Sequence, residues 1–431
     1  MLIEKLIFKK MYKDIILYQN MSSDSSSMST DVTSQSSQES LTNDSMSSSS
    51  INSDNEPKKT IVITKKNPKK TQKTASEIYQ KMEHAEHIYK KPDTYIGSCE
   101  QEDSDLYVFT NNENNTINRK HIKLTPGFYK CFDELLVNAH DHKKRMDKEI
   151  QSNRDNHYPV TNIKVEINDD DSISFYNDGD GILIEFMKDH NMYPPELIFG
   201  SLLTSTNYDD TEKREWGGRN GYGAKLANIF GKRFEVETVC HVNQKKFRQT
   251  FSDNMNNKDK PKITSCKSKP YTKIVWLPDY KRFGMDSLTE EIKNLVKKRV
   301  YDIAGVTDKD TKVYFNNKLI DVRSFEKYVD LYIGDKSGKK RVFEENQGWQ
   351  IVATSSDDDV FEQVSFVNGI NTPRGGTHVE YIADQIKNKM VDYLKKKKKL
   401  DVKPQIVKNQ LKLFVNAFKI INPMFDGQTK E

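Results

Sequence analysis

The sequence predicts an α+β fold, and three stretches carry this prediction. Residues Phe128 to Ile150 have apolar side chains at helical spacing, which predicts an amphipathic helix. Residues Ser172 to Leu183 begin as an alternating strand and then break into a turn rich in Asn, Asp and Gly. Residues Tyr271 to Leu277 begin a further strand-rich stretch. We therefore expect a mixed sheet covered by helices, followed by a second unit.

Length and composition predict an extension and two folded domains. A chain of 431 residues is long enough for two or three domains, and its hydrophobic content of 35% is low because a long polar segment dilutes it. That segment, Ser22 to Asn55, has too few apolar side chains to offset the entropy of an ordered chain. We predict a disordered Ser/Asn/Lys-rich extension over residues 1–73, an arm and first domain over 74–268, and a second domain over 269–431.

The cysteines and the N-terminus favour an intracellular, reducing location. The four cysteines, at positions 99, 131, 240 and 266, show no CxxC spacing, which argues against a zinc site and a disulfide-stapled secreted fold. Lysines interrupt the apolar runs between Met1 and Asn20, so neither a membrane span nor a secretory signal is expected there. A lysine cluster between Lys58 and Lys70 is consistent with nuclear localisation, although a viral or organellar location stays open.

A glycine-rich stretch, Gly217 to Lys225 (GGRNGYGAK), is the first sign of a ligand site. Glycine permits positive φ and a close approach of the backbone, so successive N–H groups can converge on phosphate oxygens. Lys225 adds a positive charge at the end of the stretch. The order of residues differs from that of a Walker loop, and a single glycine-rich loop is a weak signal by itself.

Three further polar clusters precede this stretch. Glu134, Asn138 and Asp141 follow one another at i, i+4 and i+7, which places them on one stripe of the predicted helix. The strand after it ends in Asn177-Asp178-Gly179-Asp180-Gly181, and a polar trio, Ser205-Thr206-Asn207, follows an apolar segment. Each cluster alone has an ordinary explanation, since a helical Glu is usually solvated and Asn-Asp-Gly is a common turn. Four clusters in this order predict a binding site.

This arrangement resembles the nucleotide site of the GHKL ATPases, the superfamily of gyrase, heat-shock chaperone, histidine kinase and MutL proteins. Lys91 to Ser98 (KPDTYIGS) further resembles the N-terminal signature of type IIA DNA topoisomerases. Ser365 to Gly369, Gly375 to His378, and Phe414 to Ala417 leading to Gln428-Thr429-Lys430 resemble the transducer domain of the eukaryotic-type enzyme. The similarity covers about Ile78 to Glu431. It implies a GHKL (Bergerat) ATPase α/β sandwich followed by a ribosomal-protein-S5-like transducer domain.

The resemblance assigns a role to each cluster. Hydrolysis of a γ-phosphate needs a carboxylate that orients or deprotonates water, and a divalent ion that neutralises developing charge. Glu134 is the expected general base, and Asn138 is the expected ligand of Mg²⁺, which prefers oxygen ligands. Asn177 is expected to read the adenine amino group beside Gly181. The trio Ser205, Thr206 and Asn207 is expected to contact ribose and phosphate. The residues expected to wrap the phosphates are Gly218, Arg219, Asn220, Gly221, Tyr222, Gly223, Ala224 and Lys225.

Other expected contacts come from outside the first domain. Gln428, Thr429 and Lys430 are expected to reach the nucleotide from the transducer, with Lys430 sensing the γ-phosphate. A run of lysines is usually no more than a solvated part of the surface. The resemblance nevertheless implies that Lys395, Lys396 and Lys397 touch DNA through sequence-independent phosphate contacts. The arm, with Tyr79, is expected to cross to a partner subunit. His140 and His142 depart from the family pattern and are assigned no catalytic role, although His142 is placed to alter contacts near the nucleotide.

These expectations describe an ATP-operated clamp. ATP and Mg²⁺ would close two copies of the chain around a DNA duplex, and hydrolysis would reopen them. The chain ends before any DNA-cleavage domain of the family, so we expect a fragment that cannot cut DNA alone. Two alternatives stay open. A mismatch-repair or chaperone ATPase should lack the Lys91 to Ser98 and Gln428 to Lys430 motifs, and a non-enzymatic binding module would bind ATP without turning it over.

Overall fold

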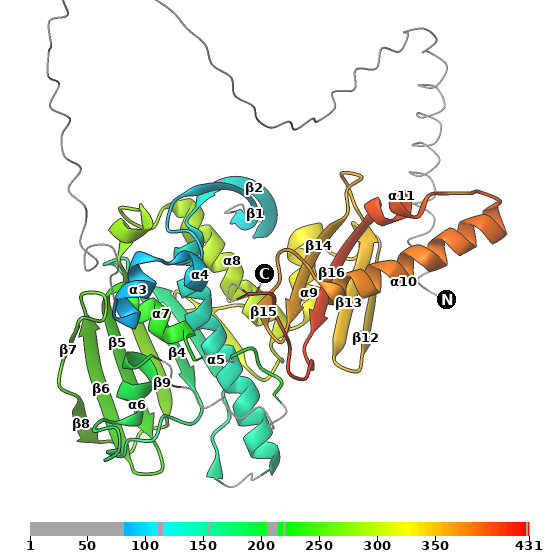
Figure 1. Ribbon diagram of the computed structural model, residues 1–431. Coiled ribbons are helices and arrows are strands. Elements are labelled where there is room, and N and C mark those ends of the chain that lie inside the picture. The colour runs from blue at the N-terminus through cyan, green and yellow to red at the C-terminus, as the bar shows by residue number, and fades with distance from the viewer. Residues whose placement is uncertain are drawn as a thin grey trace, which may run out of the picture. The chain divides into compact units, whose positions relative to one another are not determined.

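A computed structural model of the chain describes residues 82–110, 115–152, 156–202, 204, 214–218, 221–427 and 430 (Figure 1). The extension predicted over residues 1–73 and most of the predicted arm, including Tyr79, lie outside the described residues. The described part opens with two short helices, α3 (His84–Lys90) and α4 (Asp93–Ile96), and an antiparallel hairpin of β1 (Glu102–Thr110) and β2 (Thr116–Leu124). Helix and sheet content together confirm the α+β class predicted from the sequence.

The larger sheet has nine strands in the order β11-β10-β3-β4-β9-β5-β6-β7, with β8 paired to β6. Only the pairing of β10 with β3 is parallel, so the sheet is mixed, as predicted. Its strands are β3 (Asn162–Ile167), β4 (Ile173–Asp178), β5 (Gly231–Cys240), β6 (Lys245–Ser252), β7 (Asn257–Lys258), β8 (Lys262–Ser265), β9 (Tyr271–Pro278), β10 (Lys312–Phe315) and β11 (Lys318–Leu319).

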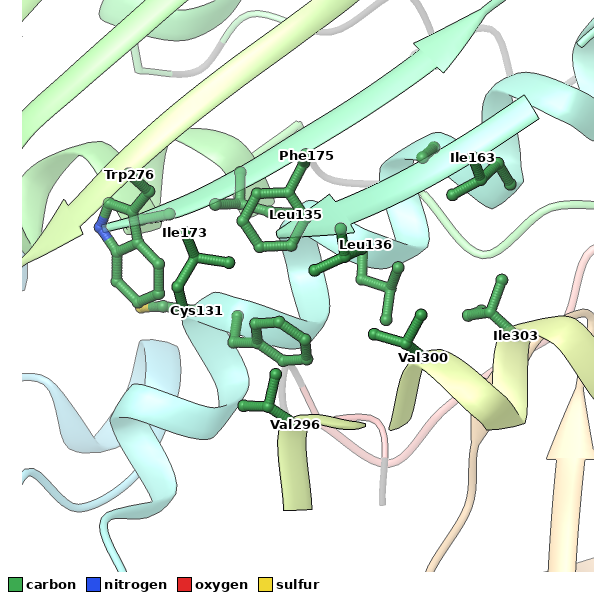
Figure 2. Close-up of a cluster of buried hydrophobic side chains, with 14 of the residues drawn as sticks. Cys131, Leu135, Leu136, Ile163, Ile173, Phe175, Trp276, Val296, Val300 and Ile303 are labelled. Carbon is green, nitrogen blue, oxygen red and sulfur yellow. The ribbon is translucent and has the colours of Figure 1, made fainter. Parts of the chain in front are cut away.

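One face of this sheet is covered by α5 (Pro126–Ser152), α6 (Pro194–Gly200) and α7 (Gly223–Ile229) (Figure 1). Figure 2 shows the packing: Cys131 and Leu135 of α5 point towards Phe175 of β4 and Trp276 of β9. Helical periodicity puts this apolar stripe on the sheet side of α5 and leaves a separate stripe for polar residues. Burying the apolar stripe therefore fixes where the polar stripe of α5 faces.

The long helix α8 (Glu290–Val306) packs beside α5 and against β10 of the larger sheet, and it ties α5 to the second sheet. Thr289 caps its N-terminus by accepting a hydrogen bond from the backbone N–H of Ile292. Arg299 is fully buried, and its Nε lies 2.6 Å from an Asp133 carboxylate oxygen on α5. The same guanidinium donates to the backbone oxygen of Gly369, 3.0 Å away, in the turn of the second sheet. One side chain thus connects three elements.

The second sheet has five strands in the order β12-β13-β16-β14-β15. They are β12 (Arg341–Asn346), β13 (Trp349–Ser355), β14 (Glu362–Val367), β15 (Ile370–Asn371) and β16 (Leu411–Ala417). Strand β16 is buried along its whole length because its Phe414 packs towards α9 (Phe325–Ile333), while Leu413 and Val415 pack towards α10 (Thr377–Tyr393). Strands β14 and β16 are parallel, and α10, the π-helical turn Leu394–Lys398 and α11 (Pro404–Asn409) connect them, which is the predicted β-α unit.

Strand β9 differs from its sequence assignment. A second domain that begins at residue 269 would contain this strand, but β9 is hydrogen-bonded between β4 and β5 in the middle of the larger sheet. Its alternating pattern indicates a strand and cannot indicate which sheet the strand joins, because pairing is a non-local contact. We therefore propose a domain boundary farther along the chain, between β11 and β12. Within the described ranges, none of the helices has the length and apolar character of a membrane span.

Candidate active site

A cavity of about 590 Å³ lies between α5, the end of β4 and the turn into α7. Its volume is within the range of pockets that hold small-molecule ligands. Its lining includes these residues predicted from the sequence: Asn138, Asn177, Gly181, Gly218, Gly221, Gly223, Ala224 and Lys225. The cavity is also walled by apolar side chains such as Leu135, Phe199 and Ile274. A single pocket therefore unites residues from five separate parts of the chain.

Glu134 lies beside this cavity and is almost fully buried, with 5% of its surface exposed. Its Oε1 atom lies 2.7 Å from Nζ of Lys130, one turn earlier on α5, and 3.0 Å from Nζ of Lys430 near the C-terminus. Burial raises the pKa of Glu134, but the two ammonium groups outweigh burial and hold this pKa at about 2. The Glu134 carboxylate is therefore charged at neutral pH.

Two glycines allow close approaches at the site. A Cβ atom on Gly223, the first residue of α7, would lie 2.2 Å from Oε2 of Glu134. A Cβ atom on Gly181 would lie 1.8 Å from the backbone oxygen of Val239 on β5. A larger residue at Gly181 would force the backbone to move, and one at Gly223 would displace the carboxylate of Glu134. Gly181 was predicted to allow close approach of a base, and the structure adds a packing reason for the same glycine.

Asp141, two turns after Glu134 on α5, holds the start of the glycine-rich stretch. Its carboxylate accepts hydrogen bonds from the backbone N–H groups of Gly218, at 2.9 Å, and Gly217, at 3.4 Å. Burial raises the pKa of Asp141 to about 6, although the nearby charges of Lys430 and Arg145 and the two N–H groups oppose this rise. Asp141 was noted on the polar stripe of the helix but was not predicted to be a site residue.

Asn177 and His142 form a polar pair in the cavity, at the end of β4. The Nδ2 atom of Asn177 lies 2.7 Å from Nδ1 of His142 and donates to the backbone oxygen of Asp178 at 2.8 Å. Burial lowers the pKa of His142 to about 3, so its ring is neutral and Nδ1 can accept. The amide N–H groups of Asn177 are therefore committed to two acceptors, which leaves its Oδ1 atom as an acceptor for a ligand.

The other predicted residues of the α7 turn differ in their orientation. Lys225 is 3% exposed, and its ammonium donates to the backbone oxygens of Thr204 and Gly221, both at 2.6 Å. Burial lowers the pKa of Lys225 to about 8. The ring of Tyr222 packs against His84 and Tyr95, at centroid distances of 6.0 and 6.3 Å. The Tyr222 ring therefore belongs to the contact with α3 and α4.

Some predicted site residues lie outside the described residues: Ser205, Thr206, Asn207, Arg219, Asn220, Gln428 and Thr429. Asn138, the predicted metal ligand, is exposed on the cavity wall. Within the described ranges, no group of three His, Cys, Asp or Glu side chains could hold a metal ion. One asparagine oxygen nevertheless fits Mg²⁺, which is commonly held by one or two protein ligands together with substrate phosphates and waters.

Lys395, Lys396 and Lys397 lie in the π-helical turn that continues α10, far along the chain from the cavity residues. All three are exposed, and Lys396 has a weak ion pair with Asp392 at 3.5 Å. The turn ends at Lys399, which has a φ of 59°. The lysines therefore project from an ordered element.

No role was predicted from the sequence for three polar residues of α5. Lys130 pairs with Glu134, Asp141 holds the glycine-rich stretch, and Arg145 lines the cavity. Burial lowers the pKa of Arg145. Helical spacing placed Asp141 on the polar stripe and could have found Lys130 and Arg145 too, because each lies four residues from a polar residue of that stripe.

Comparison with known proteins places the chain in a family. The family model described as DNA gyrase B matches residues 307–431. DNA topoisomerase 2 of Meyerozyma guilliermondii is 44% identical over 379 residues, which cover 83% of this chain and 26% of that protein. The chain spans about a quarter of the length of the curated relatives it matches.

Solved structures match over the same extent. The ATPase region of Saccharomyces cerevisiae topoisomerase II is 43% identical, with a TM-score of 0.75, and the match covers 83% of this chain and 90% of that one. The ATPase and transducer domains of Balamuthia mandrillaris DNA topoisomerase II are 42% identical, with a TM-score of 0.76, and the match covers 83% and 89%. The fold and the cavity thus define a GHKL-type nucleotide-binding domain joined to a transducer domain. The chain belongs to the eukaryotic type II DNA topoisomerase family and covers its ATPase and transducer region.

Proposed function

We propose that this chain binds ATP and hydrolyses its γ-phosphate, with Glu134 as the general base. The observation that carries the proposal is the buried, ionised carboxylate of Glu134 beside a cavity whose wall is a glycine-rich turn. A water between Glu134 and the terminal phosphate would lose its proton to the carboxylate as its oxygen attacks phosphorus, and ADP would leave. Relatives whose titles name an ATPase region support the same assignment.

Adenine recognition falls to Asn177 in this proposal. The adenine amino group is a donor and needs an acceptor, and Oδ1 of Asn177 is the atom that its own hydrogen bonds leave available. The backbone from Gly218 to Lys225 would enclose the phosphates, with Arg219 and Asn220 as predicted from the sequence. Ser205, Thr206 and Asn207 would contact ribose and phosphate. Asn138 would hold Mg²⁺, which neutralises charge that develops on the phosphate oxygens.

Lys430 would change partners during the cycle. A carboxylate with a pKa of about 2 is a weak base, because efficient general bases have pKa values nearer the working pH. A terminal phosphate in the cavity would attract Lys430 away from Glu134, and Gln428 and Thr429 would follow it to the nucleotide. Loss of one ammonium raises the pKa of Glu134, so the base becomes stronger once substrate is bound.

At the level of the whole protein, we propose an ATP-operated dimerisation clamp that captures a DNA duplex for strand passage. Lys430 follows the second sheet in the chain and pairs with α5, so nucleotide at this point would join the two domains. The exposed Lys395, Lys396 and Lys397 would contact DNA phosphates inside the closed homodimer. We place the protein in the nucleus, where duplex DNA is the substrate.

The first test is steady-state ATP turnover with and without plasmid DNA. The wild-type chain should hydrolyse ATP, and Glu134→Gln should lower kcat by about 10²- to 10⁴-fold while a non-hydrolysable analogue still binds. A wild-type chain that binds ATP but never releases phosphate would favour a non-enzymatic binding module. Turnover that plasmid DNA leaves unchanged would count against the clamp.

The second test addresses DNA contact. Replacing Lys395, Lys396 and Lys397 together by Ala should weaken duplex binding. The negative slope of log K against log salt should become smaller in magnitude by about 2.7, roughly 0.9 for each lost phosphate contact. The control replaces three exposed lysines of the larger sheet's margin, Lys260, Lys262 and Lys269. Equal losses of DNA affinity in both triple variants would mean that binding depends only on the net charge of the protein.

A further inference from the structure

Lys130 is a buried lysine to which the proposed reaction assigns no role. It lies on α5, one turn before Glu134, and the side chains of the two residues are only 8% and 6% exposed. A buried ammonium is costly even when it is paired, and an apolar side chain could fill the same space without that cost. The burial of Lys130 next to the expected base therefore points to a role beyond packing.

The two oxygens of Glu134 have different surroundings. Lys130 and Lys430 both approach Oε1, at 2.7 and 3.0 Å. Oε2 instead faces Gly223, where a Cβ atom would lie 2.2 Å away, and Gly223 lines the cavity. One oxygen is thus held by ammonium groups, while the other is directed towards the turn expected to enclose the phosphates.

We propose that Lys130 is a positioning residue, which holds Oε1 of Glu134 so that Oε2 is presented to the attacking water. This inference rests on the proposed ATP hydrolysis. Lys430 is expected to leave Oε1 for the terminal phosphate, whereas Lys130 is part of the same helix as Glu134 and has no reason to move. Lys130 then becomes the cation that keeps the carboxylate ionised and in one rotamer beside a highly charged substrate.

The charged groups around Glu134 agree with this role. Burial has the largest effect on the pKa of Glu134 and raises it. The charges of Lys130 and Lys430 have the next largest effects, and both lower this pKa. Burial raises the pKa of Cys131 on α5 well above its usual value, so this thiol is neutral, and the adjacent Asp133 is paired with Arg299 of α8. On α7, the ammonium of Lys225 is directed to backbone oxygens. The charge of Asp141 helps to raise the pKa of Lys430, which in turn pairs with Glu134.

The test compares Lys130→Met with Lys130→Arg by following kcat and KM for ATP from pH 5 to pH 9. Lys130→Met keeps most of the aliphatic stem and removes the charge. Its kcat should fall about tenfold at alkaline pH with KM nearly unchanged, because Lys130 pairs with Glu134 and is not part of the cavity lining. The acid limb of its profile of kcat against pH should move to higher pH by about 1–3 units, which is the usual effect of removing an opposite charge at this distance. Lys130→Arg should restore the position of the acid limb.

Lys143→Met is the matched control. Lys143 is also on α5 and is also 8% exposed, but it pairs with Asp147 and Asp308. Its loss should leave the acid limb in place. If Lys130→Met has the wild-type acid limb, or if KM rises while kcat is unchanged, the positioning role is wrong. If Lys130→Met fails to fold, Lys130→Gln and Lys130→Arg make the same comparison. A wild-type chain without Glu134-dependent turnover would overturn the proposed function itself, which is a separate result.

Discussion

Glu134 and Asp141 are two carboxylates on one helix with the same 5% exposure and opposite behaviour. They lie two turns apart on α5, and burial raises the pKa of both. Two ammonium groups within 3.0 Å of Glu134 bring its pKa to about 2, whereas Asp141 is opposed only by more distant charges and two backbone N–H groups and has a pKa of about 6.

The comparison teaches that burial alone does not decide the charge of a site carboxylate. An ammonium at ion-pair distance offsets the desolvation of Glu134, while two hydrogen bonds from the backbone do not offset that of Asp141. The two groups therefore suit different tasks. Glu134 has a fixed charge that can be tuned by moving Lys430. Asp141 titrates near pH 6 and holds the glycine-rich stretch through Gly217 and Gly218.

The largest expected effect on this comparison is in how the free energy of unfolding depends on pH. The folded pKa of Asp141 is raised from 3.8 to about 6, so its contribution to the free energy of unfolding is fully present below pH 3.8 and is lost as pH rises through 6. Asp141→Asn lacks this dependence. Between pH 4 and pH 7.5, the unfolding free energy of Asp141→Asn should therefore gain about 2–3 kcal/mol relative to wild type, as measured by urea denaturation.

Glu134→Gln provides the contrast in the same experiment. The pKa of Glu134 is lowered from 4.5 to about 2, so its contribution is present above pH 4.5 and is lost as pH falls towards 2. The difference between Glu134→Gln and wild type should then be constant above about pH 5.5. A difference for Asp141→Asn that is equally constant from pH 4 to pH 7.5 would contradict the assignment of a raised pKa.

The parts of this site that sequence reasoning could predict are local. Helical spacing places Glu134, Asn138 and Asp141 on one stripe of α5, and the turn after β4 follows from the run of Asn, Asp and Gly at its end. These features depend on residues close together in the chain, so periodicity and turn chemistry suffice. The α+β class and the mixed sheet follow from the same kind of signal.

The parts that escaped prediction depend on non-local contacts. The pairing of β9 between β4 and β5, and the ion pair between Lys430 and Glu134, join residues far apart in the sequence. Resemblance to a family predicted that Lys430 would reach the nucleotide, but neither that resemblance nor residue patterns predicted its ion pair with Glu134 or the position of β9. Lys130 is different, because it precedes Glu134 by four residues and is visible in the sequence. It was missed because a helical lysine is usually solvated, and only the structure shows that this one is buried.

A smaller effect tests the opposite end of the cavity, where His142 follows Asp141. His142→Ala removes the acceptor that orients the amide of Asn177, so Oδ1 of Asn177 would be directed to the ligand only part of the time. Loss of one such hydrogen bond should weaken binding of a non-hydrolysable ATP analogue about fivefold, equivalent to roughly 1 kcal/mol. The value of kcat should be unchanged, because His142 lies at the end of the cavity where we propose that the nucleotide base binds, away from Glu134.

The control for this variant is His190→Ala, since His190 is exposed and outside the cavity lining. Calorimetric titration with ATP and GTP analogues separates orientation from simple packing. If His142 orients Asn177, His142→Ala should lose affinity for the adenine nucleotide and gain relative affinity for guanine, whose carbonyl can accept from a rotated amide. An equal loss of affinity for both nucleotides would mean that His142 only fills space. The contrast along α5 would then be limited to the two carboxylates, Glu134 and Asp141.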